Sequence, residues 1–124
     1  MDNFIKTIDV SANSWFDKVN GNSYFSAVVT INFKMEDQKQ IYLGFQYGYG
    51  EQYVSETMAQ LVARGFINVE RKEGRNGGGL PSLWRWCEEN KVILRKTKFE
   101  GCKKRELMKY EDAEKLNKGL QIAN

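Results

Sequence analysis

The sequence predicts a small α+β domain: an antiparallel β-meander packed on one amphipathic helix, with a second short helix and a C-terminal basic β-hairpin. Three observations support the fold class: a turn signal at Asn20-Gly21, an alternation of apolar residues from Phe25 to Met35, and a helical stripe after the third strand. A chain of 124 residues has the length of one domain, so we expect residues 1–124 to fold as a single unit.

The segment from Ser14 to Lys34 has the pattern of a β-hairpin. Asparagine and glycine both tolerate the positive φ of a type I′ turn, so Asn20-Gly21 predicts a tight reversal. Apolar residues then occupy every second position from Phe25 to Met35, which is typical of a strand with one buried face. We expect these odd-numbered side chains to lie in the core. A separate first strand is expected at Phe4 to Val10.

A third strand and a helix complete the meander. Gln40 to Phe45 follows a polar turn, and alternation places Ile41, Leu43 and Phe45 inward. The helix is expected to begin at Gly50 or Glu51 and to end at Gly65, since a glycine suits the left-handed position after a helix. Its amphipathic stripe consists of Val54, Met58, Leu61 and Val62.

The next part of the chain predicts a connection and a second helix. Phe66 to Val69 suggests a brief strand, and the charged, glycine-rich segment Glu70 to Gly79 suggests a mobile loop. Proline suits the first turn of a helix, so we expect one from Pro81 to Asn90. Trp84 and Trp86 are two residues apart and therefore face different ways on it, one packed and one exposed.

The C-terminal segment is predicted to hold the basic hairpin. Val92 to Phe99 and Cys102 to Tyr110 are expected to pair as strands around a turn at Glu100-Gly101, and Asp112 to Lys118 to form a short terminal helix. The positive charge of the chain is concentrated here. Residues 91–110 carry eight basic and two acidic residues, while the whole chain has a net charge of +3.

Side-chain alternation in such a ribbon would place Arg95 on the opposite face from Lys96 and Lys98. The charge would then be divided between two faces. A local patch of this kind can bind phosphates or an acidic protein surface. The alternative is a solvated strand edge whose lysines prevent unwanted strand pairing.

An aromatic, glycine-spaced junction, Phe45 to Gly50, connects the third strand to the helix. Its tyrosines either close the end of the core or are exposed, where they would stack on bases or anchor a protein interface. The glycines do not form a phosphate-binding loop, because no Gly-Lys-Ser/Thr follows them. The candidate partner-binding or nucleic-acid-binding residues are Arg95, Lys96, Lys98, Lys103, Lys104, Arg105, Tyr47 and Tyr49.

Composition favours binding over catalysis. The chain has no histidine, which removes the commonest general base and the commonest metal ligand. Its two cysteines, Cys87 and Cys102, lack a metal-site spacing and are expected to be reduced thiols. We therefore expect no enzyme, no catalytic residue, no metal and no cofactor. The enzymatic alternative would use carboxylates or Cys102, whose thiol pKa neighbouring lysines would lower.

The segment W-F-D-K-V-N-G-N-S-Y, Trp15 to Tyr24, together with the junction F-Q-Y-G-Y-G, resembles a group of short uncharacterised proteins of bacteriophages and prophages. In that group a W-x-D-K-x-N-G-N-[ST]-Y hairpin precedes an aliphatic strand and an F-x-Y-G-Y junction. The resemblance covers about residues 10–62. It implies a phage-type protein that acts in a bacterial cytoplasm, and it assigns no functional residue.

These observations predict a non-enzymatic accessory protein that binds and inhibits a host nucleoprotein or defence complex, as anti-CRISPR proteins do. The alternative is a nucleic-acid-binding protein for phage replication or packaging. No apolar run approaches the ~20 residues that span a bilayer, and the N-terminus lacks a signal-peptide core, so a cytoplasmic location without a membrane partner is expected. The oligomeric state stays open, because a second copy can cover an unpaired strand edge.

Overall fold

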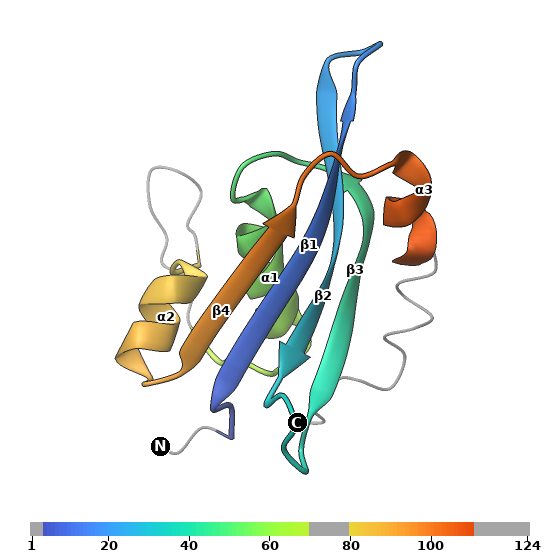
Figure 1. Cartoon of the computed structure of the whole chain (residues 1–124). Helices are drawn as coiled ribbons and strands as arrows, with labels where there is room; N and C mark the ends of the chain where they lie inside the picture. Colours follow the sequence, from blue (N-terminus) through green and yellow to red (C-terminus); the bar gives the residue numbers. More distant parts are fainter. Residues whose placement is uncertain (1–3, 70–79, 111–124) are drawn as a thin grey trace, which may run out of the picture.

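The computed structural model describes residues 4–69 and 80–110, and its centre is a four-stranded sheet in the order β3-β2-β1-β4 (Figure 1). The strands are β1 Thr7–Asp17, β2 Asn22–Ile31, β3 Lys39–Tyr47 and β4 Ile93–Phe99. The helices are α1 Gln52–Ala63, α2 Leu83–Glu89 and α3 Lys104–Leu107, and α3 continues into the 3-10 helix η1 Met108–Tyr110. The predicted α+β class is confirmed.

β1, β2 and β3 form the antiparallel meander that the sequence predicts. β1 is longer than expected. The first strand predicted at Phe4 to Val10 and the first arm of the hairpin are one continuous strand, which pairs with β2 from Ile8 to Asp17. As a result, the end of the hairpin extends past the rest of the sheet (Figure 1).

The chain reverses at Asn20-Gly21 as predicted, but the turn is not of type I′. Gly21 has a φ of 70°, whereas Asn20 has no positive φ, and the four residues from 18 to 21 close the turn between the paired Asp17 and Asn22. The Asp17 carboxylate explains the difference. It accepts hydrogen bonds from the backbone N–H groups of Val19 and Asn20 and from the Asn20 side chain.

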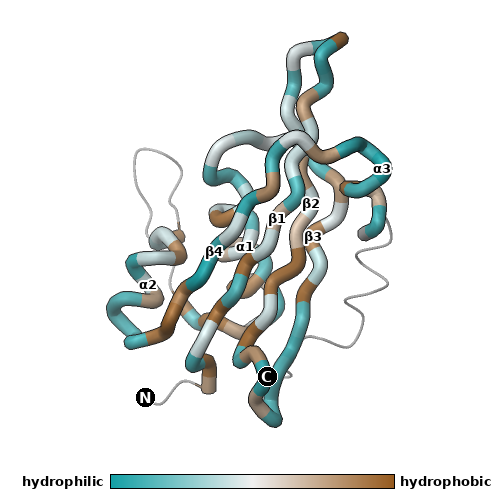
Figure 2. Tube along the Cα trace, viewed as in Figure 1, coloured by the Kyte–Doolittle hydropathy of each residue, from teal (hydrophilic) through white to brown (hydrophobic). Residues whose placement is uncertain are grey.

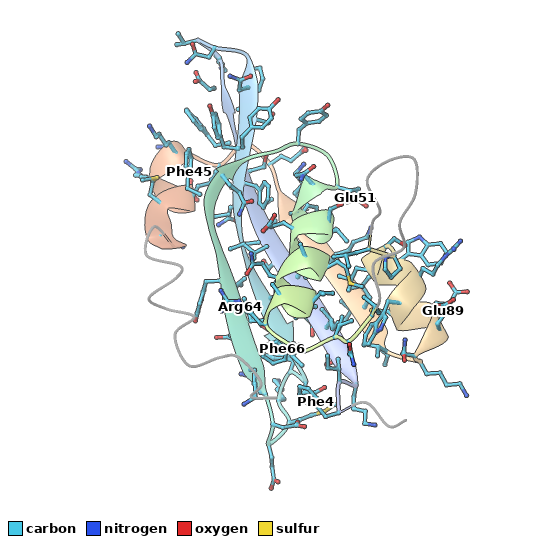
Figure 3. All side chains as sticks on the ribbon, turned by 180° about the vertical axis from the view of Figure 1, so that it is seen from behind. Phe4, Phe45, Glu51, Arg64, Phe66 and Glu89 are labelled. Atoms are coloured by element: carbon cyan, nitrogen blue, oxygen red, sulfur yellow. The ribbon has the colours of Figure 1, made fainter. Side chains whose placement is uncertain are left out.

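α1 covers one face of the sheet, which we call the α1 face (Figures 1 and 3). The predicted inward residues of β2 and β3 are buried there from Phe25 to Ile31 and at Ile41 and Leu43. α1 contributes Tyr53, Thr57, Met58 and Leu61, while Val54 and Val62 are partly buried against the core. Figure 2 shows the alternation of apolar and polar residues along the strands. Gly65, with a φ of 82°, follows the helix as predicted.

The buried alternation stops earlier than the sequence predicts. Phe33 and Met35 are 47% and 40% exposed, because β2 ends at Ile31. The next residue, Asn32, has a φ of 54° and turns the chain away from the sheet. Its buried side chain bonds to the backbone of Phe4, Lys6 and Thr7, around the start of β1, so β2 cannot continue as a strand with the same alternation.

A β-bulge in β3 turns Phe45 to the opposite face from Ile41 and Leu43. Ala27 pairs with Leu43, but Phe25 pairs with Gln46, so β3 holds one extra residue between these two pairs. An extra residue inverts the alternation of side chains. The prediction that Phe45 faces the core on α1 is therefore wrong. Gly44, within the strand, is the sequence signal typical of such a bulge.

The predicted C-terminal hairpin is wrong. β4 has no antiparallel partner after Gly101; it pairs with β1 in parallel, from Thr7↔Ile93 to Asn13↔Phe99. The chain then forms α3, where the backbone N–H of Lys103 donates to Glu106 Oε1 at 2.9 Å and fixes the first turn. Residues 103–108, K-K-R-E-L-M, are all strong helix formers, a signal that the expected strand overlooked.

The connection between α1 and β4 contains α2. Ser82 caps this helix by accepting the Arg85 N–H, and Trp86 is buried while Trp84 is 55% exposed, as their spacing predicts. No strand forms at Phe66 to Val69, so that prediction is wrong. The loop predicted at residues 70–79 and the terminal helix predicted at 112–118 lie outside the described residues. None of the described helices has the length and apolar character needed to cross a bilayer.

Candidate partner-binding surface

The structure distributes the eight predicted site residues over several places. Lys96 and Lys98 lie on the α1 face, because β1 pairs them with the core residues Val10 and Ala12, and Arg95 lies on the opposite face, as alternation predicts. The other cations, Lys103, Lys104 and Arg105, belong to α3 and its N-cap. The tyrosines also separate: Tyr47 ends β3, and Tyr49 lies in the loop before α1.

Two lysines of β4 connect this strand to the start of α1. Lys96 Nζ lies 2.5 Å from Glu51 Oε1, and Lys98 Nζ donates to the carbonyl of Gly50 at 3.0 Å. The hydrogen bond between Lys96 and Glu51 raises the pKa of the lysine and lowers the pKa of the carboxyl group. Lys98 also lies 3.6 Å from Glu100. Their charges therefore have partners within the fold.

Arg95 also has an internal partner. Its guanidinium forms two hydrogen bonds with the Asp9 carboxylate, at 2.6 and 3.1 Å, across the β1–β4 pair. This ion pair raises the pKa of Arg95. The three cations of β4 are thus paired within the molecule, and the cations without a carboxylate partner among the described residues lie elsewhere.

The face opposite α1 carries a compact aromatic cluster under α3. Tyr24 stacks on Phe45 with ring centroids 5.0 Å apart and on Trp15 at 5.6 Å. Tyr47 meets the edge of Tyr24 at 5.8 Å. Lys104 Nζ lies 5.8 Å from the Trp15 ring centroid and 5.9 Å from that of Phe45, within the range of a cation–π interaction. The bulge makes this cluster possible, because it turns Phe45 to the same face as Tyr24.

α3 and η1 place further positive charge beside these rings. This segment and its N-cap carry Lys103, Lys104, Arg105 and Lys109 against one acidic residue, Glu106, whose carboxylate already accepts the Lys103 N–H. Within the described residues, none of these four cations has a carboxylate within ion-pair distance. We call this region the aromatic–basic surface; it consists of Trp15, Tyr24, Phe45, Tyr47, Lys103, Lys104 and Arg105.

Sequence reasoning found four of these seven residues. It missed Trp15, Tyr24 and Phe45 as members of the site, although the hairpin register pairs Trp15 directly with Tyr24. Tyr49 was predicted to belong with Tyr47; it is 70% exposed but makes no ring contact with the cluster among the described residues.

The thiols have ordinary structural surroundings. Cys87 is buried in the core, and burial raises its pKa to about 11, which keeps it protonated. The Cys102 thiol donates to the Phe99 carbonyl at 3.2 Å, and the Cys102 N–H donates to Ser14. In the parts of the chain that the structure covers, no three histidine, cysteine, aspartate or glutamate side chains gather as metal ligands. Neither cysteine belongs to the aromatic–basic surface, which offers rings and cations that can bind a partner.

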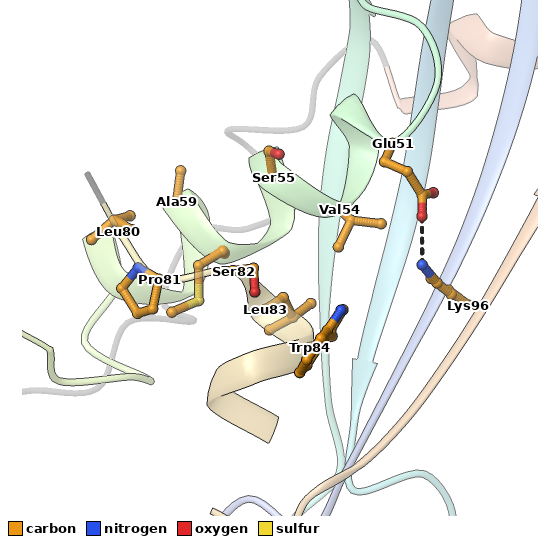
Figure 4. Close-up of a pocket in the computed structure, with 11 residues that line it drawn as sticks. Glu51, Val54, Ser55, Ala59, Leu80, Pro81, Ser82, Leu83, Trp84 and Lys96 are labelled. Carbon is orange, nitrogen blue, oxygen red and sulfur yellow. Dashed lines mark hydrogen bonds and ion pairs between the residues drawn. The ribbon is translucent and has the colours of Figure 1, made fainter. Parts of the chain in front are cut away.

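A groove on the other side of the molecule lies between α1, α2 and the edge of β4 (Figure 4). It encloses about 570 Å³. Apolar side chains line most of it, including Met58, Leu83 and the exposed Trp84, and the Glu51–Lys96 ion pair closes one end. Its lining can accommodate an apolar group and contains no cluster of unpaired polar side chains.

Comparison with known proteins found no matching family model, no matching curated protein and no matching solved structure. Function is therefore inferred from the chemistry of the surface.

Proposed function

We propose that this chain is a non-enzymatic, phage-type accessory protein that binds and inhibits a host nucleoprotein or defence complex, in the manner of anti-CRISPR proteins. Its contact region would be the aromatic–basic surface. The observation that supports this proposal is a partly exposed aromatic cluster with Lys104 of α3 over two of its rings, in a helix whose cations have no carboxylate partner among the described residues.

The composition of this surface suits a protein partner with an acidic patch. Aromatic residues and arginine are enriched at the centres of protein interfaces and supply much of the binding energy. The rings of Trp15, Tyr24 and Phe45 contact each other, and Lys104 lies over two of them, so much of their area is already in use. What they present outward is a preorganised set of rings beside cations that have no carboxylate partner among the described residues.

Charge reversal tests the proposal. In the double variant Lys103→Glu/Arg105→Glu, we expect binding to the host complex to weaken at least about tenfold, because two cations that attract an acidic patch are replaced by two carboxylates that repel it. The matched control is Lys34→Glu/Lys39→Glu, which changes the net charge equally near the β2–β3 turn. Both variants keep Lys104, which stacks on the rings. The host complex is first isolated by its binding to the immobilised protein, and the affinity of each variant for that complex is then measured. Unchanged affinity in the first variant would exclude this surface as the contact region.

The second candidate function is binding of nucleic acid, and one observation favours it. Tyr47 and Tyr49 are 58% and 70% exposed, so each retains ring area that a base can stack on. This function predicts that labelled DNA or RNA binds and that affinity falls steeply between ~50 and ~200 mM salt.

A double variant separates the two functions. If nucleic acid is the ligand, Tyr47→Ala/Tyr49→Ala should lower affinity for single strands by about 1–3 kcal/mol per stacked base. Phe33→Ala removes an exposed ring near the β2–β3 turn and serves as the control. Fluorescence anisotropy with single- and double-stranded DNA and RNA gives the result. Our first proposal predicts no salt-sensitive binding to any of these strands.

A further inference from the structure

Within the described sheet, β4 is an edge strand whose outer side has no strand partner. The Ile93 N–H donates to the Lys6 carbonyl at 3.0 Å, so the alternate residues from Ile93 to Phe99 direct their backbone groups toward β1. Leu94, Lys96 and Lys98 direct theirs away from the sheet. Among the described residues, nothing bonds to these outward N–H groups. Such an edge is a template for another strand.

The side chains that usually protect an edge are engaged elsewhere. Lysines on an edge strand oppose strand addition when their charges are free beside it. Here Lys96 pairs with Glu51, and Lys98 bonds to the Gly50 carbonyl at the start of α1. The same strand exposes two large apolar side chains, Ile93 at 57% and Phe99 at 53%. Together they favour association along this edge.

The exposed apolar residues are placed symmetrically. Ile93 and Phe99 lie at equal distances from Lys96 along the strand, and alternation places both on the face opposite α1. When the strand pairs antiparallel with a copy of itself about Lys96, each Ile93 lies opposite Phe99 of the second copy. A shift of the axis by one residue breaks both apolar pairs. This internal symmetry favours a second copy of this chain over an unrelated strand.

We propose that β4 pairs antiparallel with β4 of a second copy of this chain, about a two-fold axis through Lys96. The three outward residues would supply about six hydrogen bonds, two for each directly opposed pair. The two Lys96 side chains meet near the axis, and each brings its own counter-charge in Glu51. Arg95, already paired with Asp9, would lie opposite Thr97 of the second copy.

The pairing would join two sheets into one and leave both aromatic–basic surfaces accessible. α3 and η1 pack near β1, β2 and β3, and Figure 1 shows α3 on the far side of the sheet from the β4 edge. The dimer therefore goes beyond the proposed function and does not depend on it. Strand pairing alone buries less than the ~1,600 Å² of a standard interface, so we expect a dissociation constant of roughly micromolar order.

Sedimentation equilibrium between ~1 and ~200 µM, which brackets micromolar association, tests the dimer. We expect the unmodified chain to pass from monomer to dimer over this range. Ile93→Asp should shift the dissociation constant at least about tenfold upward, since it places a charge opposite Phe99 of the second copy. Phe33→Asp, at an exposed apolar site away from β4, should leave the dissociation constant unchanged. A monomer throughout the range would overturn the proposal.

Cysteine cross-linking tests the register. In a Cys102→Ser background, Lys96→Cys places two thiols opposite each other at the axis, and mild oxidation should give a covalent dimer. Thr97→Cys in the same background should not cross-link, because its Cα atoms would be farther apart than the ~7 Å that a disulfide spans. Equal cross-linking of both variants, or none at Lys96→Cys, would overturn this register. Circular dichroism checks that each variant remains folded.

Discussion

Replacing Asn32 with alanine is expected to lower the free energy of unfolding by about 3–5 kcal/mol, which is a large part of the total for a small domain. The Asn32 side chain has no exposed surface, and its Oδ1 accepts the N–H groups of Lys6 at 2.6 Å and Thr7 at 3.3 Å. Its Nδ2 donates to the Phe4 carbonyl at 3.0 Å. Alanine leaves these backbone groups without that partner, and it adopts the φ of 54° less readily than asparagine, whose short polar side chain can hydrogen-bond locally.

Two further substitutions at Asn32 separate these causes. Asn32→Gly keeps the backbone conformation accessible and removes only the side-chain hydrogen bonds, so we expect a smaller loss than for alanine. Asn32→Asp keeps the acceptor for Lys6 and Thr7 but replaces the donor to Phe4 with an oxygen in a buried site. Urea unfolding of the three variants gives the comparison. A loss below about 1 kcal/mol for Asn32→Ala would show that the side-chain bonds add little beyond a typical net hydrogen bond.

Truncation of Leu107 to alanine should cost about 2–5 kcal/mol and should disorder α3 before the rest of the fold. Leu107 is fully buried, although it belongs to a helix of four residues whose other side chains are exposed or half-buried. A helix this short is not stable without packing. Its contacts with β1 and β2 therefore hold Lys104 over the aromatic cluster.

The neighbouring residue provides the control. Met108 is about as large as Leu107 but only half-buried, so Met108→Ala should cost clearly less. Urea unfolding measures the global effect, and hydrogen exchange of the backbone amides of Arg105 to Leu107 measures the local one. If Leu107→Ala left both unchanged, α3 would be held by other contacts. If our proposed function holds, this variant should also weaken partner binding without a change in charge.

The sequence correctly predicted those elements that a repeat among neighbouring residues defines. Period two from Phe25 to Ile31 corresponds to the buried side of β2, and the helical stripe from Val54 to Val62 corresponds to α1. The spacing of Trp84 and Trp86 was sufficient to show that only one is buried. In each case a single repeat determines which side chains share a face, and neighbours along the chain are enough to define it.

Predictions failed where a distant or unrecognised contact decides the conformation. The reversal at Asn20-Gly21 was correctly placed, but the Asp17 carboxylate selects a longer turn. The segment predicted as a strand at residues 102–110 is helical from Lys104 to Tyr110, because Glu106 caps the first turn and Leu107 occupies a buried position. The bulge that turns Phe45 depends on pairing with β2, which residue alternation within β3 does not contain.

The sequence by itself determined that this is an α+β chain with a histidine-free composition, a β-meander, an amphipathic helix and a basic C-terminal segment. Only the tertiary structure decided that β4 lies parallel to β1 and which cations have an ion-pair partner among the described residues. Arg95 meets Asp9 across 86 residues of sequence, and Lys96 meets Glu51 across 45. A count of charges treats all basic residues of this segment alike. In the folded chain, however, those on β4 form ion pairs, whereas α3 carries its cations beside the aromatic cluster.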